Sequence, residues 1–376
     1  LGDLKNLDVL IPPKPEQRAI VAKIEQLFSE LDNGIANLKT AKDKLEIYRQ
    51  AVLKKAFEGE LTKEWREEQS DLPTADELLE EIKEERLKHY ENQLTEWEET
   101  VVKWEVNGKH GKRPSKPKKF KPIRKWSDDE IKSLDSIPNE WKWVRIVETV
   151  FDTNDDIVDG PFGSNLKNSD FSEDGTVPVI GISNIDEGFK TKIRYVTEEK
   201  FQTISRSAVY PGNIIVAKIG SSYGKTGIYP EWMPVGLIPA NLLRIKPSDF
   251  YHRELMVLYL QSLVFKRKLD RIMKSTAQPA FNVSAFKDLA IPFMSKGEQL
   301  QLKNEIESRL SVCDNILANI EEGLEKSEAL RQSILKKAFE GKLLSEEELE
   351  ACRKVPDWEP AEKLLERIKN QKEVTA

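Results

Sequence analysis

The chain has 376 residues, of which 33% are charged and 39% hydrophobic, and its formal net charge is −6. That length is sufficient for two or three domains with packed cores. The small net charge excludes a polycation, so any contact with nucleic acid must come from local basic patches. Cys313 and Cys352 provide neither a disulfide framework nor a zinc pattern, which indicates a reducing cytoplasm. No apolar run reaches membrane-spanning length, and Leu1 is not an initiator methionine, so we expect the natural N-terminus to lie upstream.

One long stretch occurs twice. Residues 16–61 return without a gap as residues 298–343, and the two copies match most closely at RQAVLKKAFEGEL and RQSILKKAFEGKL. Each copy follows an Ile-Pro step, which disfavours helix, and each reaches a glycine, Gly59 or Gly341, that suits a C-terminal helix cap. Each copy therefore predicts a helix of about 43 residues, on the order of 65 Å long.

Apolar residues recur along both copies with heptad spacing, which is typical of a coiled coil. Arg49 and Arg331 interrupt the seam at matching places, where a polar residue can fix register. We expect the two helices to pair with each other; the alternative is that each packs on its own domain. The seam positions are Ile24, Leu31, Leu38, Leu45 and Val52 with Phe28, Ile35, Lys42, Arg49 and Ala56, and in the second copy Ile306, Cys313, Ile320, Ser327 and Ile334 with Leu310, Leu317, Leu324, Arg331 and Ala338.

In chain order, residues 1–12 match residues 281–292 in phase. Residues 281–292 close a globular region, so residues 1–12 are expected to be the tail of a similar domain upstream. The first long helix is expected over residues 13–61. Residues 62–136 are then expected to be helical, from Ala75 to about Val102, before the chain becomes a basic, proline-rich linker.

The linker sequence NGKHGKRPSKPKKFKPIRKW carries nine Lys or Arg and no acid. Its prolines exclude helix and favour an extended chain. Two interpretations stay open: the segment lies along a phosphate backbone, or it neutralises the acidic helix before it.

Residues 137–292 are expected to form a globular domain. Short apolar runs separated by Gly, Pro, Asn and Asp (VPVIGISNI, KIRYV, NIIVAKIG, GIYPEW, LIPANLLRIK) predict strands, with one helix over residues 251–273. The second long helix is expected over residues 293–344 and a helical extension over 345–376. The fold class is therefore α+β, a sheet-rich domain with two long helices expected to pair in a coiled coil.

Several catalytic chemistries fail on spacing. The loop GSSYGKT, residues 220–226, is one residue short of a phosphate-loop motif, and the next segment cannot form the required helix, although such a loop suits contact with a polyanion. His89, His110 and His252 are too scattered for a metal cluster or a catalytic triad. No cofactor loop is present, and no pair of acids stands out as a general acid and base. The sequence therefore indicates a non-catalytic binding protein without a metal or cofactor of its own.

Together these features resemble the specificity subunit of Type I restriction-modification enzymes. The carrying motifs are IPPKPEQ, LKKAFEGEL, LKKAFEGKL, IPNEWKWVRI, DGPFGSNLK, VIGISNI and STAQPAFN. The resemblance implies a target recognition domain over residues 137–292 that reads one half of a split site in double-stranded DNA. It also implies that the two long helices form an antiparallel coiled coil and act as a ruler. The helices would dock modification subunits, which supply the adenine methyltransferase, and restriction subunits through them.

By the same resemblance, S-adenosylmethionine and ATP belong to the partner subunits, the location is cytoplasmic, and no membrane is involved. Full-length members of the family carry two recognition domains, whereas this chain has one and the tail of another. Two interpretations stay open here: a fragment, or a half-subunit that forms a homodimer.

Base reading requires polar side chains on loops that reach the major groove. For each candidate the alternative is a turn residue that satisfies its own backbone. Lys266, Arg267, Lys268 and Arg271 could contact phosphates or form the exposed face of the domain helix. A rival from another class is a coiled-coil scaffold that does not read DNA. The candidate DNA-binding residues are Ser164, Asn165 and Lys167; Ser221, Ser222, Tyr223, Lys225 and Thr226; and Lys274, Ser275, Thr276 and Gln278.

Overall fold

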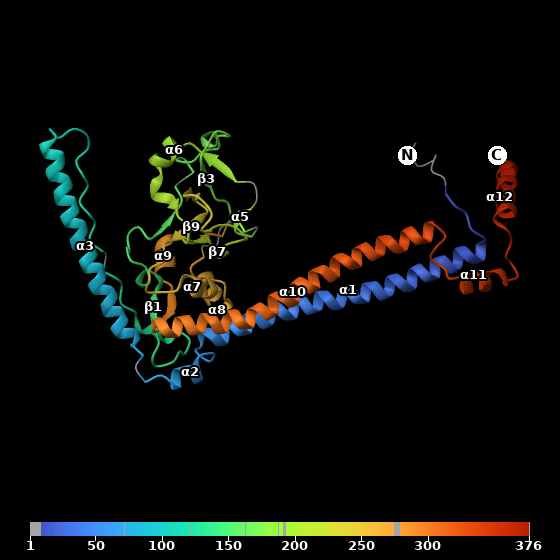
Figure 1. Ribbon diagram of the computed structural model, residues 1–376, viewed down its shortest axis with the longest axis horizontal. Helices are drawn as coiled ribbons and strands as arrows, with labels where there is room; N and C mark the ends of the chain where they lie inside the picture. The colour runs from blue at the N-terminus through green and yellow to red at the C-terminus, as the bar shows by residue number, and fades with distance from the viewer. Residues whose placement is uncertain are drawn as a thin grey trace. The chain divides into compact units, whose positions relative to one another are not determined.

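The computed structural model describes residues 9–70, 72–120, 122–161, 163–186, 188–190, 193–273 and 279–375 (Figure 1). The chain forms two compact units. One is Gln50–Arg309, and the other combines Leu1–Arg49 with Leu310–Ala376. The long helices α1 (Lys14–Phe57) and α10 (Lys296–Phe339) each contribute to both units.

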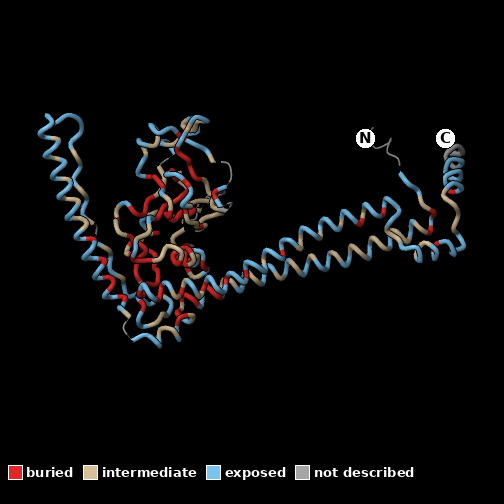
Figure 2. The backbone as a smooth tube through the Cα atoms, viewed as in Figure 1, coloured by how far each residue is buried: buried red, intermediate tan, exposed pale blue. Residues whose placement is uncertain are grey.

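In the unit that combines Leu1–Arg49 with Leu310–Ala376, α1 and α10 form an antiparallel coiled coil. Each step up α1 is matched by an equal step down α10 in the ion pairs that join them, which is the signature of antiparallel packing. Most seam positions are half-buried or buried, with Lys42 an exposed exception, and most residues between them are exposed (Figure 2). The predicted coiled coil is therefore confirmed. The ion pairs are Arg49–Asp314 at 2.8 Å, Lys42–Glu321 at 3.0 Å, and Arg331–Asp32.

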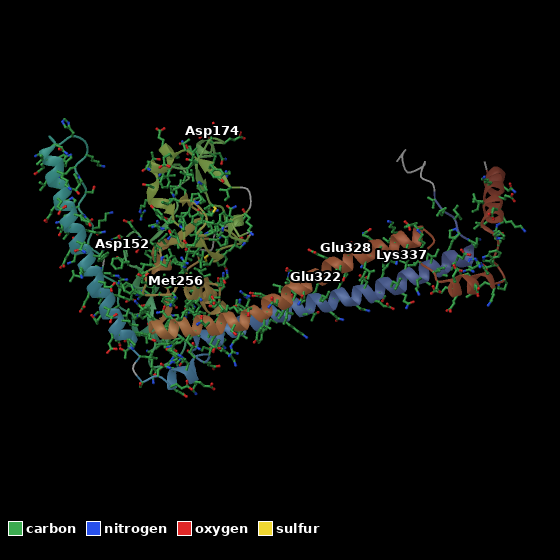
Figure 3. The ribbon with its side chains drawn as sticks, viewed as in Figure 1. Asp152, Asp174, Met256, Glu322, Glu328 and Lys337 are labelled. Carbon is green, nitrogen blue, oxygen red and sulfur yellow. The ribbon has the colours of Figure 1, made fainter. Side chains whose placement is uncertain are left out.

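The face of α10 opposite the seam carries both acidic and basic side chains. The side chains of Glu322, Glu328 and Lys337, labelled in Figure 3, are exposed. Exposed charges opposite an apolar seam are typical of a helix that buries one stripe only. Helices α11 (Glu346–Arg353) and α12 (Ala361–Thr375) follow α10 in the same unit.

Both long helices end in the same cap. Gly59 and Gly341 adopt the left-handed conformation, with φ of 79° and 72°. The next residue donates its N–H to the carbonyl five residues back, at 3.0 Å for Glu60 and 2.8 Å for Lys342. This is a Schellman cap, which glycine adopts without strain. The helices begin close to the expected bounds, α1 at Lys14 and α10 at Lys296. Pro15 fits the first turn of α1, because its missing N–H has no helical partner there.

The globular domain lies in the Gln50–Arg309 unit and contains two four-stranded sheets and a two-stranded ribbon among its described residues. One sheet has the order β2-β9-β6-β7 and is antiparallel throughout. The other has the order β4-β3-β8-β5, in which β3 and β8 run parallel, and the ribbon pairs β1 with β10. The strands are β1 (Lys142–Arg145), β2 (Ile157–Asp159), β3 (Val177–Val179), β4 (Arg194–Val196), β5 (Ala208–Val209), β6 (Ile214–Ala217), β7 (Thr226–Ile228), β8 (Gly236–Leu237), β9 (Leu242–Ile245) and β10 (Ala290–Phe293).

Buried residues are concentrated in this domain, as Figure 2 shows, and many of them are apolar. Tyr229 and Ile215 belong to one cluster and Leu237 to another, while Met256, labelled in Figure 3, is fully buried in α7. The short helices of the domain are α4 (Asp128–Lys132), α5 (Ile182–Asp186), α6 (Glu198–Thr203), α7 (Arg253–Leu260), α8 (Leu263–Arg271) and α9 (Val283–Lys287).

Two local predictions in this domain were wrong. The helix expected over residues 251–273 is broken into α7 and α8. Ser262 causes the break, because its buried hydroxyl accepts the N–H of Phe265 and caps a new helix. The segment ISNI, expected in a strand, forms α5 instead. Its buried Asn184 accepts the N–H of Gly181 at 2.7 Å and so closes a turn.

Helices α2 (Lys63–Glu67) and α3 (Ala75–Val106) belong to the same unit as the globular domain. A capping box between Thr74 and Glu77 starts α3, which runs beyond the expected end near Val102. Buried Arg86 anchors α3 by donating to the carbonyls of Glu148 at 2.7 Å and Phe151 at 3.2 Å. The basic segment then returns along α3 without helix or strand; its residues 109–120 are called the strap below.

Candidate nucleic-acid interface

One edge of the β2-β9-β6-β7 sheet gathers two of the predicted loops. Strands β2 and β6 both run antiparallel to β9, so they are parallel to each other. Their C-terminal ends therefore lie at the same edge, together with the start of β9. The first loop, residues 160–168, follows β2, and the second loop, residues 218–225, follows β6.

Lys218 joins the bases of these loops. Its ammonium lies 2.5 Å from the carboxylate of Asp159, the last residue of β2. Its backbone N–H donates to the carbonyl of Asn241 at 2.8 Å, just before β9. The Lys218 side chain is only 12% exposed, so water screens this ion pair less than a surface pair. Sequence reasoning missed Lys218, although its position directly after an apolar strand was a signal.

Asn241 is a second residue that the sequence did not single out. Its side-chain oxygen is buried and has no hydrogen-bond partner among the described residues. Buried polar atoms are normally paired, so this amide is a candidate to bind a partner molecule. Its position at the same sheet edge as Lys218 adds an amide, the group that pairs with adenine, to the candidate interface.

The third predicted loop carries Lys274, Ser275, Thr276 and Gln278, which lie outside the described residues. The chain just after it meets the second loop. The N–H of Gly220 donates to the carbonyl of Pro279 at 3.0 Å, and Ile219 forms an antiparallel bridge with Ala280. Pro279 and Ala280, which follow the third loop, therefore lie beside the second loop.

In the first loop the candidates Ser164, Asn165 and Lys167 are exposed. Leu166 between them packs partly buried against the apolar cluster of the second sheet and so ties the loop down. Gly160 is required at the loop's base, since a Cβ there would lie 2.1 Å from the backbone of Pro239. The first loop thus presents polar side chains from a fixed base.

In the second loop the candidates differ in accessibility. Ser221 is exposed, and Ser222, Tyr223 and Lys225 are half-buried. Thr226 is buried, and its hydroxyl donates to the carbonyl of Gly224 at 2.9 Å, so its side chain holds the turn.

Tyr223 packs on α8. Its hydroxyl donates to Asp270 at 2.8 Å, and the ammonium of Lys266 lies 3.2 Å from its ring centre. These contacts fix the second loop on α8 and leave Ser221 and Ser222 as its freer polar groups. Arg267 and Arg271 on the same helix are exposed and available to phosphates.

Lys268 does not lie on the exposed face of α8. It is buried against the ring of Trp143, at 4.6 Å from the ring centre, and pairs with Asp135 at 3.2 Å. Burial lowers the pKa of Lys268, and the Asp135 carboxylate opposes that shift. The expectation of a phosphate contact or an exposed side chain was wrong for this residue, because Trp143 and Asp135 cover it.

The described residues contain no group of three or more His, Cys, Asp or Glu side chains placed to hold a metal ion. His89 packs edge-on against Phe151 at 4.7 Å between ring centres, and His252 precedes α7 without a side-chain cap bond. Within the described part of the chain, no helix is both long and apolar enough to cross a bilayer.

Comparison with known proteins gives a family match for part of the chain. Residues 148–327 match the model of the Type I restriction modification DNA specificity domain. The similarity to curated specificity subunits extends over nearly the whole chain. It is 25% identical over 372 residues to the Type I restriction enzyme EcoDI specificity subunit of Escherichia coli, covering 99% of this chain and 70% of the relative. It is 26% identical over 371 residues to the EcoBI specificity subunit of the same organism, covering 96% of this chain and 64% of that relative.

A solved structure of a type I R-M system shows the same fold. Its matched chain is 17% identical, with a TM-score of 0.54 over 87% of this chain and 60% of that chain. The matched residues 148–327 include most of the globular domain described above and much of α10. This chain spans about two thirds of the length of the EcoDI and EcoBI subunits.

Proposed function

We propose that this chain is a specificity subunit and a non-catalytic DNA reader. Its target recognition domain reads one half of a split site through the loops at the sheet edge of Lys218 and Asp159. The observation that supports the proposal is that two polar loops start from the same edge of the sheet, where Lys218 pairs with Asp159. The chain just after the third loop lies beside the second of them. A scaffold that does not bind DNA has no need for several polar loops at one edge of a sheet. Reading of the major groove, in contrast, requires polar side chains from such loops.

The internal repeat supports a second recognition domain. In the first copy Phe57 is buried and packs edge-on against Tyr259 of α7, with ring centres 4.9 Å apart. Gln50 in the same copy accepts the N–H of Leu263 at 2.9 Å. In the second copy Phe339 takes the place of Phe57, yet it is 73% exposed. A second domain of the same fold would cover Phe339 as α7 covers Phe57.

The segment before α1 leads to the same proposal. Val9 and Leu10 are 67% and 75% exposed, whereas their counterparts Leu289 and Ala290 are buried. Ala290 lies in β10, which pairs with β1 of the recognition domain. Because the coiled coil is antiparallel, Val9 and Phe339 lie near the same end of it. A second recognition domain therefore has both a strand to pair with and an apolar face to cover. It would come from a longer form of this chain or from a second copy.

The coiled coil also offers matched contact points for modification subunits. Tyr48 and Leu330 occupy equivalent places in the two copies and are 48% and 52% exposed. Large exposed apolar side chains at equivalent places suit two copies of one partner. In this proposal the modification subunits bind there, carry S-adenosylmethionine and join the restriction subunits, which use ATP. The complex acts in the cytoplasm.

Selection of duplexes from a random pool tests the proposal. The purified complex of this chain with its modification subunit is expected to enrich a motif, and Asn165→Ala with Lys225→Ala is expected to abolish enrichment. Ser345→Ala, far along the chain in the cap of α11, is the matched control and should leave the motif unchanged. Failure of the natural complex to enrich any motif would favour the scaffold.

A further inference from the structure

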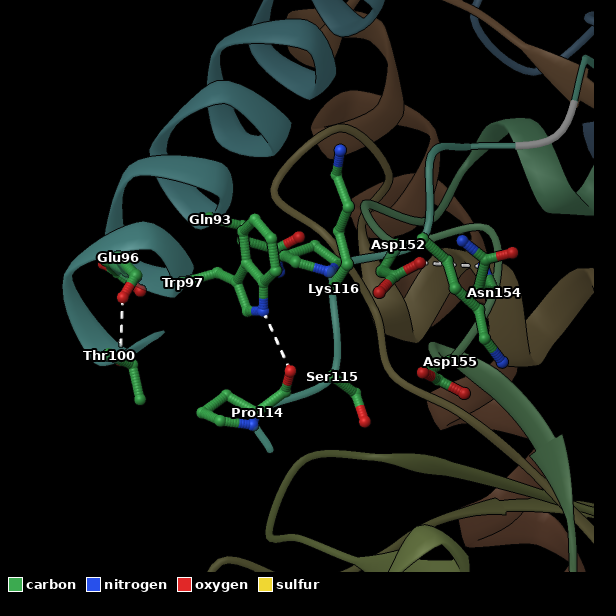
Figure 4. Close-up of a pocket in the computed structure, with 12 residues that line it drawn as sticks. Gln93, Glu96, Trp97, Thr100, Pro114, Ser115, Lys116, Asp152, Asn154 and Asp155 are labelled. Carbon is green, nitrogen blue, oxygen red and sulfur yellow. Dashed lines mark hydrogen bonds between the residues drawn. The ribbon is translucent and has the colours of Figure 1, made fainter. Parts of the chain in front are cut away.

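The strap is held along α3 by aromatic side chains. The indole N–H of Trp97 donates to the carbonyl of Pro114 at 3.1 Å, as Figure 4 shows. The indole N–H of Trp104 donates to the carbonyl of Gly111 at 3.4 Å. Proline and a hydrogen-bonded backbone together make this an extended segment with restricted freedom, unlike a flexible linker.

The chain after the strap is fixed to the recognition domain. The guanidinium of Arg145, fully buried, donates to the carbonyls of Arg124 at 2.9 Å and Lys125 at 3.3 Å. It also lies 3.9 Å from the ring centre of Trp126. Both ends of the basic segment are therefore anchored, so its cations are presented in a defined order.

Most cations of the strap have no carboxylate partner in the described part of the chain, although the ammonium of Lys116 lies 5.5 Å from the ring centre of Trp97. Lys109 pairs with Glu105 at 3.7 Å, and beyond the strap Arg124 pairs with Glu130 at 2.5 Å. In the described part of the chain the remaining strap cations form no ion pair within 4.0 Å, although acidic α3 runs beside them. They are all exposed, and they are Lys112, Arg113, Lys116, Lys118 and Lys119.

Carboxylates near the strap have partners of their own. Asp152 and Asp155 line a cavity of about 490 Å³ with Lys116 and Lys118 (Figure 4). Asp152 accepts the N–H of Asn154 at 2.8 Å, and Asp155 pairs with Arg206 at 3.3 Å. Among the described residues, Asp152 and Asp155 therefore form no ion pair with the strap cations, although they line the same cavity.

The basic residues continue beyond the strap toward the candidate interface. Arg124, just after the strap, lines a cavity of about 390 Å³ together with Asp159 and Arg206. Asp159 is the base of the first loop, so the basic segment runs from the middle of α3 to the edge of the sheet that carries the polar loops. A polyanion seated on that edge would meet the strap next.

We propose that the strap is a second DNA contact, independent of sequence, that binds backbone phosphates of duplex flanking the half-site. This inference rests on the proposed function, since the recognition loops place the DNA. Extended Lys and Arg side chains that bind phosphates contribute affinity through release of counterions, without reading bases. The strap would thus raise affinity for any duplex and leave the choice of motif to the loops.

The test compares two triple variants in the full complex with the modification subunit. Lys116→Gln, Lys118→Gln and Lys119→Gln remove three cations of the strap. The matched control removes three exposed lysines from α3, the helix beside the strap. These substitutions are Lys83→Gln, Lys88→Gln and Lys103→Gln. The measured quantity is the slope of log affinity against log salt concentration, for a duplex with the selected motif and for an unrelated duplex.

The strap variant should lower the steepness of that slope by about 2 to 3 on both duplexes, since each lost phosphate contact removes about 0.9. The control should change it by less than about 0.5, and the methylated motif should stay the same in both. Equal slopes for the two variants would overturn the inference. It would also be overturned if the strap variant weakened binding of the modification subunit while its DNA slope stayed natural, because the partner would then be a protein. If the natural complex enriched no motif, the proposed function would be refuted. The role of the strap would still be tested, because its salt slope can be measured on an unrelated duplex.

Discussion

The guanidinium of Arg49 lies 2.8 Å from the carboxylate of Asp314 across the coiled coil. The same contact occurs again in reverse, because Arg331 and Asp32, which occupy the equivalent places in the other copies, also pair. Arg331 additionally lies over the ring of Phe28, at 4.7 Å from its centre. The same ion pair therefore occurs twice in the coiled coil, because the sequence repeat places its two residues in both helices. Both pairs form in one register of the seam.

These pairs should stabilise the helix pair modestly. In a double-mutant cycle of Arg49→Ala and Asp314→Ala, we expect a coupling free energy of about 0.5 to 1 kcal/mol, as for half-exposed ion pairs. Urea unfolding of the complete chain, followed by circular dichroism, measures it. Lys326 and Glu322, an exposed pair within α10, serve as the control cycle. A coupling no larger than the control's would contradict a role of Arg49 in register.

Lys218 should matter for DNA reading more than for folding. Lys218→Met leaves the Asp159 carboxylate without its cation at the base of two loops, so affinity for the selected duplex should fall roughly tenfold or more, the loss expected for one specific contact. Lys218→Arg should recover part of it. Lys246→Met removes an exposed lysine that pairs with Asp156 at 3.8 Å, and it should leave affinity unchanged. Equal losses for Lys218→Met and Lys246→Met would argue against the shared loop base.

Two phenylalanines at equivalent places should respond differently. Phe57→Ala removes a buried ring that packs on Tyr259, so the free energy of unfolding should fall by about 3 to 5 kcal/mol. Phe339→Ala removes an exposed ring and should change it by less than about 0.5 kcal/mol. The Phe339 variant should instead weaken assembly with a second recognition domain, seen as a smaller complex in light scattering. A large loss of stability for Phe339→Ala would mean that its ring is already covered.

Glu130 makes stability depend on acid. Hydrogen bonds from Arg124 and from the backbone of Ser127 lower the pKa of Glu130 from 4.5 to about 2. A carboxyl with a depressed folded pKa stabilises the protein above its unfolded pKa, and that contribution is lost as the pH falls from about 4.5 toward 2. The urea midpoint of Glu130→Gln should therefore lie below that of the natural chain at pH 7, and the gap should narrow toward pH 3. Asp128→Asn, on an exposed residue of the same helix, should show no such convergence. A gap of constant size would exclude this linkage.

Much of the fold was predictable because it follows from periodic patterns. The heptads of residues 24–56 and 306–338 predicted that the two helices pair, and alternating apolar runs predicted the sheet-rich domain. The antiparallel direction of the helices was implied by the family resemblance. The helix break at Ser262 and the turn at Asn184 were missed because each depends on one side chain that hydrogen-bonds to the backbone. Such local competition is invisible to periodicity.

The candidate interface was predictable only in outline. Polar loops could be identified from composition, but the ion pair of Lys218 with Asp159 depends on which strand ends share a sheet edge, and strand order is not encoded locally. The burial of Lys268 likewise depends on the packing of α8 against Trp143. The anchoring of the strap by Trp97 needed the structure, since the sequence left an extended linker and a phosphate contact equally open.

The most direct test of the central claim is a map of methylated adenines in DNA from cells that express this chain with its modification subunit. The proposal predicts a motif split into two parts by a fixed spacer, with one part changed or lost when Asn165→Ala and Lys225→Ala are introduced. A palindromic split motif would mean that two copies of this recognition domain act together, and an asymmetric one that a different domain supplies the other half. Absence of any methylated motif, or a motif unaffected by those substitutions, would contradict the assignment of DNA reading to these loops.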